Sequence, residues 1–223
     1  RGNRRVRDFL LSYYRHSGPV WRVAWSHPRY GSLLASCSYD GTVHIFKLLK
    51  DKSYSTVYVY KGHKAQVDYL NTKDLVNAIS WAPYEYGACL AAVSSDGCMS
   101  CIYQKSVSFS SPSILDETEW ESTITTICRL GCNCVSWAPF RPGTSEDASV
   151  LRVAIGAGDK YVHIMKYMFM FVYRRCINSP LNIWELESKL RGHEDRVKDV
   201  VWSPYIGDTT DVIASCGRVG TVF

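Results

Sequence analysis

WSHPRYGSLLASCSYDG (residues 25–41) and WAPYEYGACLAAVSSDG (residues 81–97) are two copies of one pattern. They agree at eight of seventeen positions, and both begin with a Trp and end in Asp-Gly. Trp25 and Asp40 therefore recur as Trp81 and Asp96, each 56 residues later. A unit that recurs at such a spacing within one chain is typical of a repeat protein, in which every copy is one supersecondary unit.

The pattern continues along the chain. Trp137 follows after a further 56 residues and Trp202 after another 65. Each Trp opens a Pro-containing turn, followed by a short apolar run and then by a small polar turn, which contains Asp40, Asp96 or Asp159 in the first three copies. Short runs rich in Val, Ile and aromatic residues are typical of strands, and Asp-Gly between two of them indicates a hairpin whose two central residues need positive φ. We find no long stretch of helical periodicity, so the sequence predicts an all-β protein of repeated antiparallel meanders.

A second anchor precedes the tryptophans. His16 and His193 are each nine residues before a Trp, whereas His63 is eighteen residues before its Trp. In the third repeat, the position nine residues before Trp137 is occupied by Cys128.

We expect the His and the turn Asp of a repeat to meet through a buried hydrogen bond, because a buried polar group without a partner costs about 1–3 kcal/mol. The last repeat has Val219 at the position that corresponds to Asp40, so no His–Asp bond is expected there. The other histidines are expected to lie in a turn (His27) or at outward strand positions (His44 and His163).

Gly-His, Val-x-x-Val-x-Trp and Asp-Gly, in this order, form the pattern of WD40 propeller blades, although Phe46, Ile102 and Met165 replace the final Trp of that motif. Four stretches are more specific: HSGPVWRVAWSHPRYGSLLASCSYDGTVHIF (16–46), VNAISWAPYEYG…AVSSDG (76–97), GCNCVSWAP (131–139) and HEDRVKDVVWSPYIG…IASC…GTVF (193–223). They resemble the small β-propeller subunit of the COPII outer coat, which is also a scaffold subunit of the nuclear-pore Y-complex.

The resemblance implies a single β-propeller domain over residues 1–223, with about four blades visible of an open six-bladed ring. It assigns residues 1–15 to a remnant of a preceding blade, 16–60, 61–110 and 120–175 to three blades, and 181–223 to an incomplete blade. The residues of the blade signature are His16, Trp25, Asp40, His63, Trp81, Asp96, Trp137, Asp159, His193 and Trp202. Because the blades that flank the family's open gap are not in the sequence, we expect a portion of a longer chain, and the partner-binding residues stay unknown.

For function, the resemblance implies a non-enzymatic scaffold of COPII vesicles in transport from the endoplasmic reticulum to the Golgi, and of the nuclear pore. The implied partner is a helical-solenoid coat subunit or nucleoporin that inserts a blade by strand addition. The implied location is cytoplasmic, peripheral at the endoplasmic reticulum membrane and on COPII vesicles, and at the nuclear pore. Two alternatives stay open: the paralogous nucleoporin propeller of the Y-complex, which shares the HSG-x-VWRV segment, and a generic WD40 adaptor with its ligand on loops at one face.

Composition narrows the remaining classes. With 46% hydrophobic and 13% aromatic residues, the 223-residue chain can bury a sizeable core, and its net charge of +5 is mild. No basic motif is interleaved with aromatic residues, so we expect no nucleic-acid partner. The longest apolar run, residues 167–173, is far shorter than the about twenty residues of a membrane-spanning helix, so we expect a buried strand there and only peripheral contact with membranes.

Catalytic and metal signals are poor. Nine cysteines are an odd number and several lie on predicted strands, which favours structural thiols in a reducing, cytosolic compartment. Cys98-x-x-Cys101 and Cys132-x-Cys134 lack a second ligand pair at zinc spacing, so no metal and no cofactor are expected. There is no Gly-x-Ser-x-Gly elbow and no phosphate loop, so no catalytic residue is assigned and the protein is not expected to be an enzyme.

Overall fold

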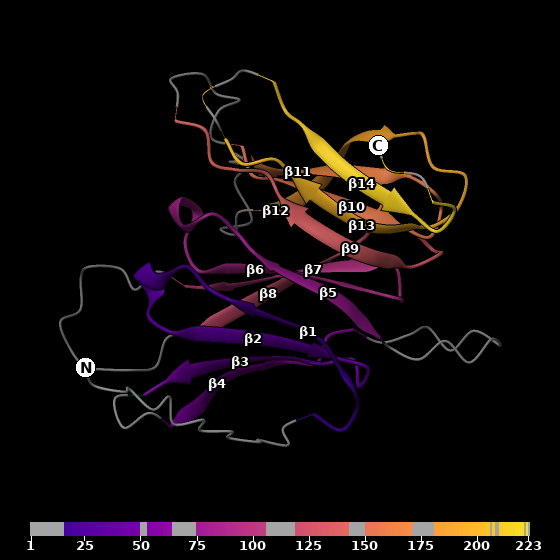
Figure 1. The fold of residues 1–223 in the computed structure, drawn as a ribbon. Helices are drawn as coiled ribbons and strands as arrows, with labels where there is room; N and C mark the ends of the chain where they lie inside the picture. Colours follow the sequence, from indigo (N-terminus) through magenta and orange to yellow (C-terminus); the bar gives the residue numbers. More distant parts are fainter. Residues whose placement is uncertain are drawn as a thin grey trace, which may run out of the picture.

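The computed structural model describes residues 16–49, 53–63, 75–105, 119–142, 150–170, 181–205, 207, 210–220 and 222. Within these residues the chain forms fourteen strands and two short 3-10 helices. The strands make three four-stranded sheets and one two-stranded sheet, and every pairing is antiparallel. Each sheet takes consecutive strands of the chain in order, so each is a meander (Figure 1). The prediction of an all-β fold is confirmed.

The first sheet contains β1 (Val20–Trp25), β2 (Leu33–Ser38), β3 (Val43–Leu48) and β4 (Tyr54–Tyr60). The second contains β5 (Val76–Trp81), β6 (Cys89–Ser94), β7 (Cys98–Gln104) and β8 (Trp120–Thr126). The third contains β9 (Cys132–Trp137), β10 (Arg152–Ala157), β11 (Val162–Met170) and β12 (Leu181–Leu190). The fourth contains β13 (Val197–Trp202) and β14 (Ile213–Gly217), and the 3-10 helices η1 (Pro28–Tyr30) and η2 (Tyr84–Tyr86) follow β1 and β5. Every repeat Trp is thus the last residue of the first strand of its sheet.

The outer strands correct the blade boundaries expected from the sequence. β8 pairs with β7 and closes the second sheet, although residues from 120 onward were assigned to the third blade. Likewise β12 pairs with β11 and closes the third sheet, although residues from 181 onward were assigned to the last blade. The outer strand of a sheet carries neither the Trp nor the Asp-Gly of the repeat, so the repeat does not mark it, and the free edge of the preceding strand decides where it pairs.

The hairpin turns also differ from the expectation of two positive φ angles. Gly41 and Gly97 have φ of 78° and 82°, but the Asp before each is not in the left-handed region. Gly41 N donates to Ser38 O at 3.2 Å, which closes a β-turn immediately before the left-handed glycine. This is the three-residue hairpin loop rather than the two-residue one. Lys160, with φ 74°, takes the glycine's place in the third sheet.

The apolar run at 167–173 is a strand as far as the structure describes it. β11 extends to Met170, and residues 171–173 lie outside the described residues. Among the described residues, no helix combines the length and the apolar content needed to cross a bilayer.

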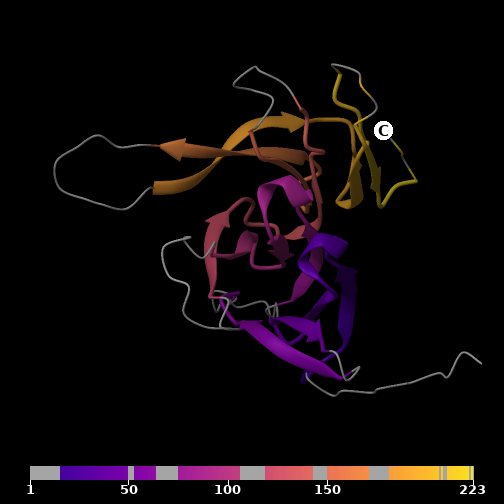
Figure 2. The same ribbon diagram turned by 90° about the vertical axis from the view of Figure 1, so that its left-hand side faces the viewer.

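The sheets are stacked in chain order, with the first (indigo) and the fourth (yellow) at opposite ends of the stack (Figures 1 and 2). Their first strands lie side by side, β1 against β5, β5 against β9 and β9 against β13. Each interface between neighbouring sheets has an apolar core of its own. Ile45 and Leu90 are fully buried between the first and second sheets, and Met99 and Ile155 between the second and third.

The repeat Trp links one sheet to the sheet before it. Trp81 Nε1 donates to Ala24 O at 3.0 Å, and Trp137 Nε1 donates to Ser80 O at 2.8 Å. In both cases the acceptor is the residue just before the Trp of the preceding sheet. The 56-residue period of the sequence is therefore the period of an inter-sheet hydrogen bond.

We expect Trp137→Phe to lower the free energy of unfolding by about 1–3 kcal/mol, because it deletes this donor, leaves Ser80 O short of a buried partner and removes ring volume. Trp25→Phe is the matched control, since Trp25 is 56% exposed and should lose less than about 0.5 kcal/mol. Urea unfolding of both variants, followed by circular dichroism, checks the difference. Equal losses in the two variants would contradict the inter-sheet role.

Candidate functional site

The first two repeats bring their His and Asp together. In the first sheet, His16 Nδ1 lies 3.1 Å from Asp40 Oδ2, and His16 Nε2 lies 2.7 Å from Ser36 Oγ. Asp40 also accepts the Ser17 N–H at 2.8 Å and the Thr42 hydroxyl at 2.6 Å. The carboxylate thus ties the loop before β1 to the β2–β3 turn.

In the second sheet the same pair is more deeply buried. His63 Nδ1 lies 2.9 Å from Asp96 Oδ2, and the two side chains are 0% and 5% exposed. His63 Nε2 lies 3.0 Å from Ser100 Oγ, which lies 2.6 Å from the Tyr60 hydroxyl. Asp96 also accepts the Cys98 N–H at 2.8 Å. The carboxylate and the imidazole are both held by several partners, as a buried polar network requires.

The third and fourth repeats depart from this arrangement. Asp159 lies 2.9 Å from Nε2 of His163, which belongs to β11 of the same sheet. In the fourth sheet His193 Nε2 lies 2.8 Å from Ser215 Oγ, in a repeat that has no turn Asp. The contact between the loop His and the turn Asp is therefore present in the first two sheets and is replaced by other contacts in the last two.

The expectation that His44 and His163 point outward is wrong. His44 is 8% exposed and His163 is 1% exposed. Val162 and Ile164, on either side of His163, are buried as well, so this part of β11 has no solvent-facing side. The His44 ring instead lies 4.0 Å from the His16 ring, measured between centroids.

The turn carboxylates have depressed pKa values. Burial alone raises the pKa of Asp40, but hydrogen bonds from Thr42 and Ser17, together with His16, outweigh it and lower the pKa to about 2. Burial likewise opposes the lowering at Asp96, where the hydrogen bond and the charge of His63 dominate.

These directions predict acid sensitivity. A carboxyl whose pKa is lower in the folded than in the unfolded protein stabilises the fold above its unfolded value, near 4, and that stability is lost as the pH falls toward the folded value. We expect the free energy of unfolding to fall between about pH 4 and pH 2, and to fall less steeply in Asp40→Asn. Denaturant unfolding at a series of pH values checks this; identical slopes in the two proteins would exclude Asp40 as a contributor.

The four signature tryptophans do not converge on one site. Trp25 is exposed and Trp81 is half-buried, whereas Trp137 and Trp202 are buried. Trp202 Nε1 donates to Asp211 Oδ1 at 3.1 Å, in place of a carbonyl of the preceding sheet. Trp81 and Trp137 both border one open hollow, but Trp25 and Trp202 do not line it, so the four tryptophans share no cavity among the described residues.

The outer face of β1 is an apolar surface that no other described residues cover. Val20, Val23 and Trp25 are 49%, 60% and 56% exposed. At the positions equivalent to Val23, Ile79 and Val135 are 3% and 4% exposed, because the preceding sheet covers them. The β1 face therefore has the composition of an inter-sheet interface without its partner sheet.

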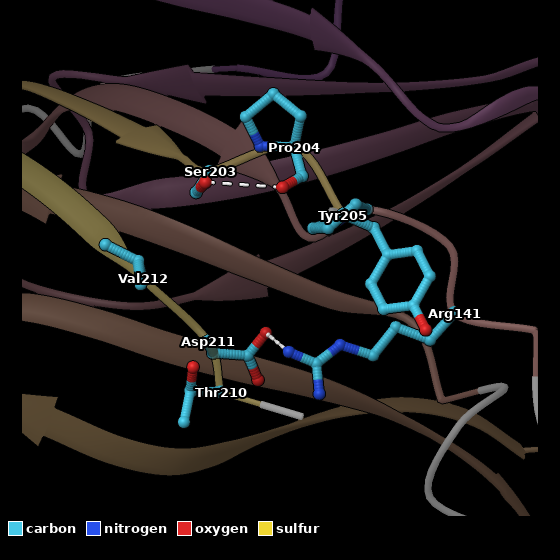
Figure 3. A pocket seen from close by; sticks show the side chains of 8 residues that line it. Arg141, Ser203, Pro204, Tyr205, Thr210, Asp211 and Val212 are labelled. Carbon is cyan, nitrogen blue, oxygen red and sulfur yellow. Dashed lines mark hydrogen bonds and ion pairs between the residues drawn. The ribbon is translucent and has the colours of Figure 1, made fainter. Parts of the chain in front are cut away.

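Figure 3 shows a small pocket between the third and fourth sheets, with a volume of about 40 Å³. It is lined by Pro139, Arg141, Ser203, Pro204, Tyr205, Thr210, Asp211 and Val212. Arg141 forms an ion pair with Asp211 across it, and the guanidinium lies 5.9 Å from the centre of the Tyr205 ring. A volume of this size holds water rather than a metabolite, so the pocket is a polar contact between sheets.

A larger, open hollow of about 490 Å³ lies over the Trp-x-Pro turns of the second and third sheets. His27 borders it, accepts the Arg29 N–H at Nδ1 (3.2 Å) and stacks on Tyr84 with 4.4 Å between ring centroids. These contacts give His27 a role in the turn, as expected.

Comparisons with known proteins show which proteins this chain resembles. The family model "WD domain, G-beta repeat" matches residues 7–47. Over 97% of its length the chain is 32% identical to the Protein SEC13 homolog of Drosophila melanogaster, and over 93% it is 33% identical to the Protein transport protein SEC13 of Mycosarcoma maydis. The chain contains one matched WD40 repeat and is similar to SEC13 proteins over most of its length. It is also 28% identical, over 95% of its length, to the Nucleoporin SEH1-A of Xenopus laevis.

The resemblance seen in the sequence is thereby confirmed, including its second choice, the nucleoporin. The four sheets of this WD40-repeat chain are consistent with the blades of a propeller. The chain spans 55%, 60% and 55% of the lengths of these three relatives.

The second partners of the histidines are the residues that the sequence does not reveal. Ser36, Ser100 and Ser215 each bond a His; Ser36 and Ser215 belong to the second strand of their sheets (β2 and β14), whereas Ser100 belongs to the third strand of its sheet (β7). No fixed spacing connects them to the repeat. The one available signal is that Ser36 and Ser215 occupy the same position of aligned stretches, two residues after Leu34 and Ile213.

Proposed function

We propose that the chain is part of a non-enzymatic scaffold subunit of the COPII coat, acting in transport from the endoplasmic reticulum to the Golgi, with a second role at the nuclear pore. The observation that carries the proposal is similarity to SEC13 proteins along 93–97% of the chain rather than in a single repeat. The polar residues of the described chain support it, because the His–Asp pairs have structural partners and each pair joins a loop to a hairpin turn of its own blade.

The proposed mechanism of assembly is completion of an open propeller by a blade from a helical-solenoid partner. The stacking of the blades supports it, since each blade buries an apolar face of the next one and a terminal blade keeps such a face free, as β1 does at Val20 and Val23. A further blade, from the same protein or from the partner, can cover a face of this kind. Strand addition supplies backbone hydrogen bonds for affinity and side-chain pockets for specificity.

The proposed location follows from the proposed assembly. The protein would be cytoplasmic and would reach the endoplasmic reticulum membrane and COPII vesicles through the coat, with another population at the nuclear pore. The proposed partners are proteins and not nucleic acids.

Affinity purification of the intact protein, with mass spectrometric identification of stoichiometric partners, tests the proposal. A helical-solenoid COPII coat subunit in amounts equal to the bait is the expected result. Recovery of nucleoporins alone would overturn the coat assignment and favour the second candidate, which the similarity to SEH1-A supports. A fully closed propeller in the intact protein would overturn blade insertion while leaving the scaffold role untouched.

A further inference from the structure

Three side chains with metal-binding atoms meet in the third sheet. Cys128 lies in the turn after β8, Asp159 in the β10–β11 turn and His163 in β11. One ligand atom from each, Sγ, a carboxylate oxygen and a ring nitrogen, lies within 4.8 Å of the other two. Cys128 and His163 are buried, and the Asp159 side chain is 20% exposed, so the cluster is enclosed but has an approach from solvent at the carboxylate.

The cluster arises from two departures from the repeat. The position of Cys128 is occupied by His16 in the first repeat, where the imidazole bonds the turn Asp. In the third repeat the thiol replaces that imidazole, and His163 approaches the same carboxylate from the strand. Asp159 therefore faces a sulfur and a nitrogen together, and among the described residues only this group has its three ligand atoms within 4.8 Å of one another.

The turn that carries Cys128 is also arranged around its sulfur. The Leu130 N–H donates to Cys128 Sγ at 3.4 Å, and the Gly131 N–H closes the turn on Cys128 O at 3.2 Å. The turn therefore holds the sulfur in a fixed position beside Asp159 and His163. This contact is independent of the spacing of the three ligand atoms.

We propose that Cys128, Asp159 and His163 bind one divalent transition-metal ion of borderline softness, with Zn²⁺ as the physiological choice. A thiolate, an imidazole and a carboxylate are the ligands that Zn²⁺ takes in proteins, and three of them leave the fourth tetrahedral position to solvent. Binding releases the Cys128 thiol proton to solvent. The Asp159–His163 hydrogen bond is then replaced by two bonds to the metal, and the neutral His163 ring carries its proton on Nδ1 instead of Nε2.

The consequence of such a site is a cross-link between blades. The main chain of Cys128 is already joined to the second sheet, because the Ile127 and Cys128 N–H groups both donate to Gly97 O. Asp159 and His163 belong to the third sheet. A metal held by all three side chains fixes the second blade to the third, at the one described repeat where Cys replaces the His.

Cobalt(II) is the probe for the test, because thiolate ligation gives it a charge-transfer band in the near ultraviolet. The intact, reduced protein is titrated with Co²⁺ alone, and one equivalent is expected to produce that band together with the visible bands of tetrahedral cobalt. Zn²⁺ added afterwards is expected to abolish both. Cys128→Ser should weaken Co²⁺ binding at least tenfold, whereas Cys216→Ser, at a half-buried thiol of the fourth sheet, should leave the titration unchanged.

Cys128→His keeps the test valid if the Ser variant folds poorly. It introduces the residue type of the first two blades and retains a metal ligand, so Co²⁺ should still bind while the charge-transfer band disappears. The proposal is overturned if one equivalent of Co²⁺ produces no thiolate band in the parent protein. It is equally overturned if the band persists in folded Cys128→His, since another thiol then supplies it.

Discussion

Gly97→Ala is expected to destabilise the intact protein by more than about 3 kcal/mol. A Cβ on this residue would lie 1.8 Å from the carbonyl oxygen of Cys128, which is a backbone atom and cannot rotate away. Moving the two segments apart would break the bonds from the Ile127 and Cys128 N–H groups to Gly97 O, at 2.8 and 3.0 Å. The alanine would also have to adopt the left-handed φ of 82°, which costs about 1–2 kcal/mol by itself.

Gly87→Ala separates these two causes. Gly87 has a similar φ of 90°, but nothing lies within 4 Å of the position that its Cβ would take. Its ψ of 179° places it in a region that is essentially restricted to glycine, so this variant should lose only a conformational cost of about 1–3 kcal/mol. Denaturant unfolding of both variants measures the steric contact as the difference between them. If Gly97→Ala lost no more than Gly87→Ala, the close contact between the β6–β7 turn and Cys128 would not exist in solution.

The sequence predicts the inner strands of this fold well, because the repeated residues are the ones that make the contacts between blades. The indole N–H of Trp81 and of Trp137 donates to the carbonyl of the residue just before the Trp of the preceding blade. The spacing of these tryptophans therefore reports a physical contact between blades. The outer strands carry no residue of the repeat, so the sequence does not mark them. β8 alternates between covered and exposed residues and meets a single strand, so its pairing with β7 follows from chain geometry rather than from any motif.

The polar sites divide in the same way. The His63–Asp96 contact is foreseen because both residues belong to the repeat. The contact between His163 and Asp159 is not, because the rule of alternating faces assumes that one side of a strand meets water. In β11, Val162, His163 and Ile164 are all at most 5% exposed. There is therefore no alternation of buried and exposed residues from which the position of His163 could be predicted.

Asp96→Ala is expected to lower the free energy of unfolding by about 2–4 kcal/mol, because it leaves the fully buried His63 without its acceptor and the Cys98 N–H without its partner. Glu119→Ala is the matched control: its carboxylate is 71% exposed and pairs at 3.2 Å with Lys105, so solvent replaces the lost contact and little change is expected. Asp96→Asn should fall between the two, since its one amide oxygen can replace only one of the two carboxylate oxygens that bond His63 and the Cys98 N–H. Urea unfolding at pH 7 gives the order of the three variants. An Asp96→Ala protein as stable as Glu119→Ala would mean that the turn is held by its glycine and backbone bonds alone, and that the His–Asp pair is not what joins the loop to the blade.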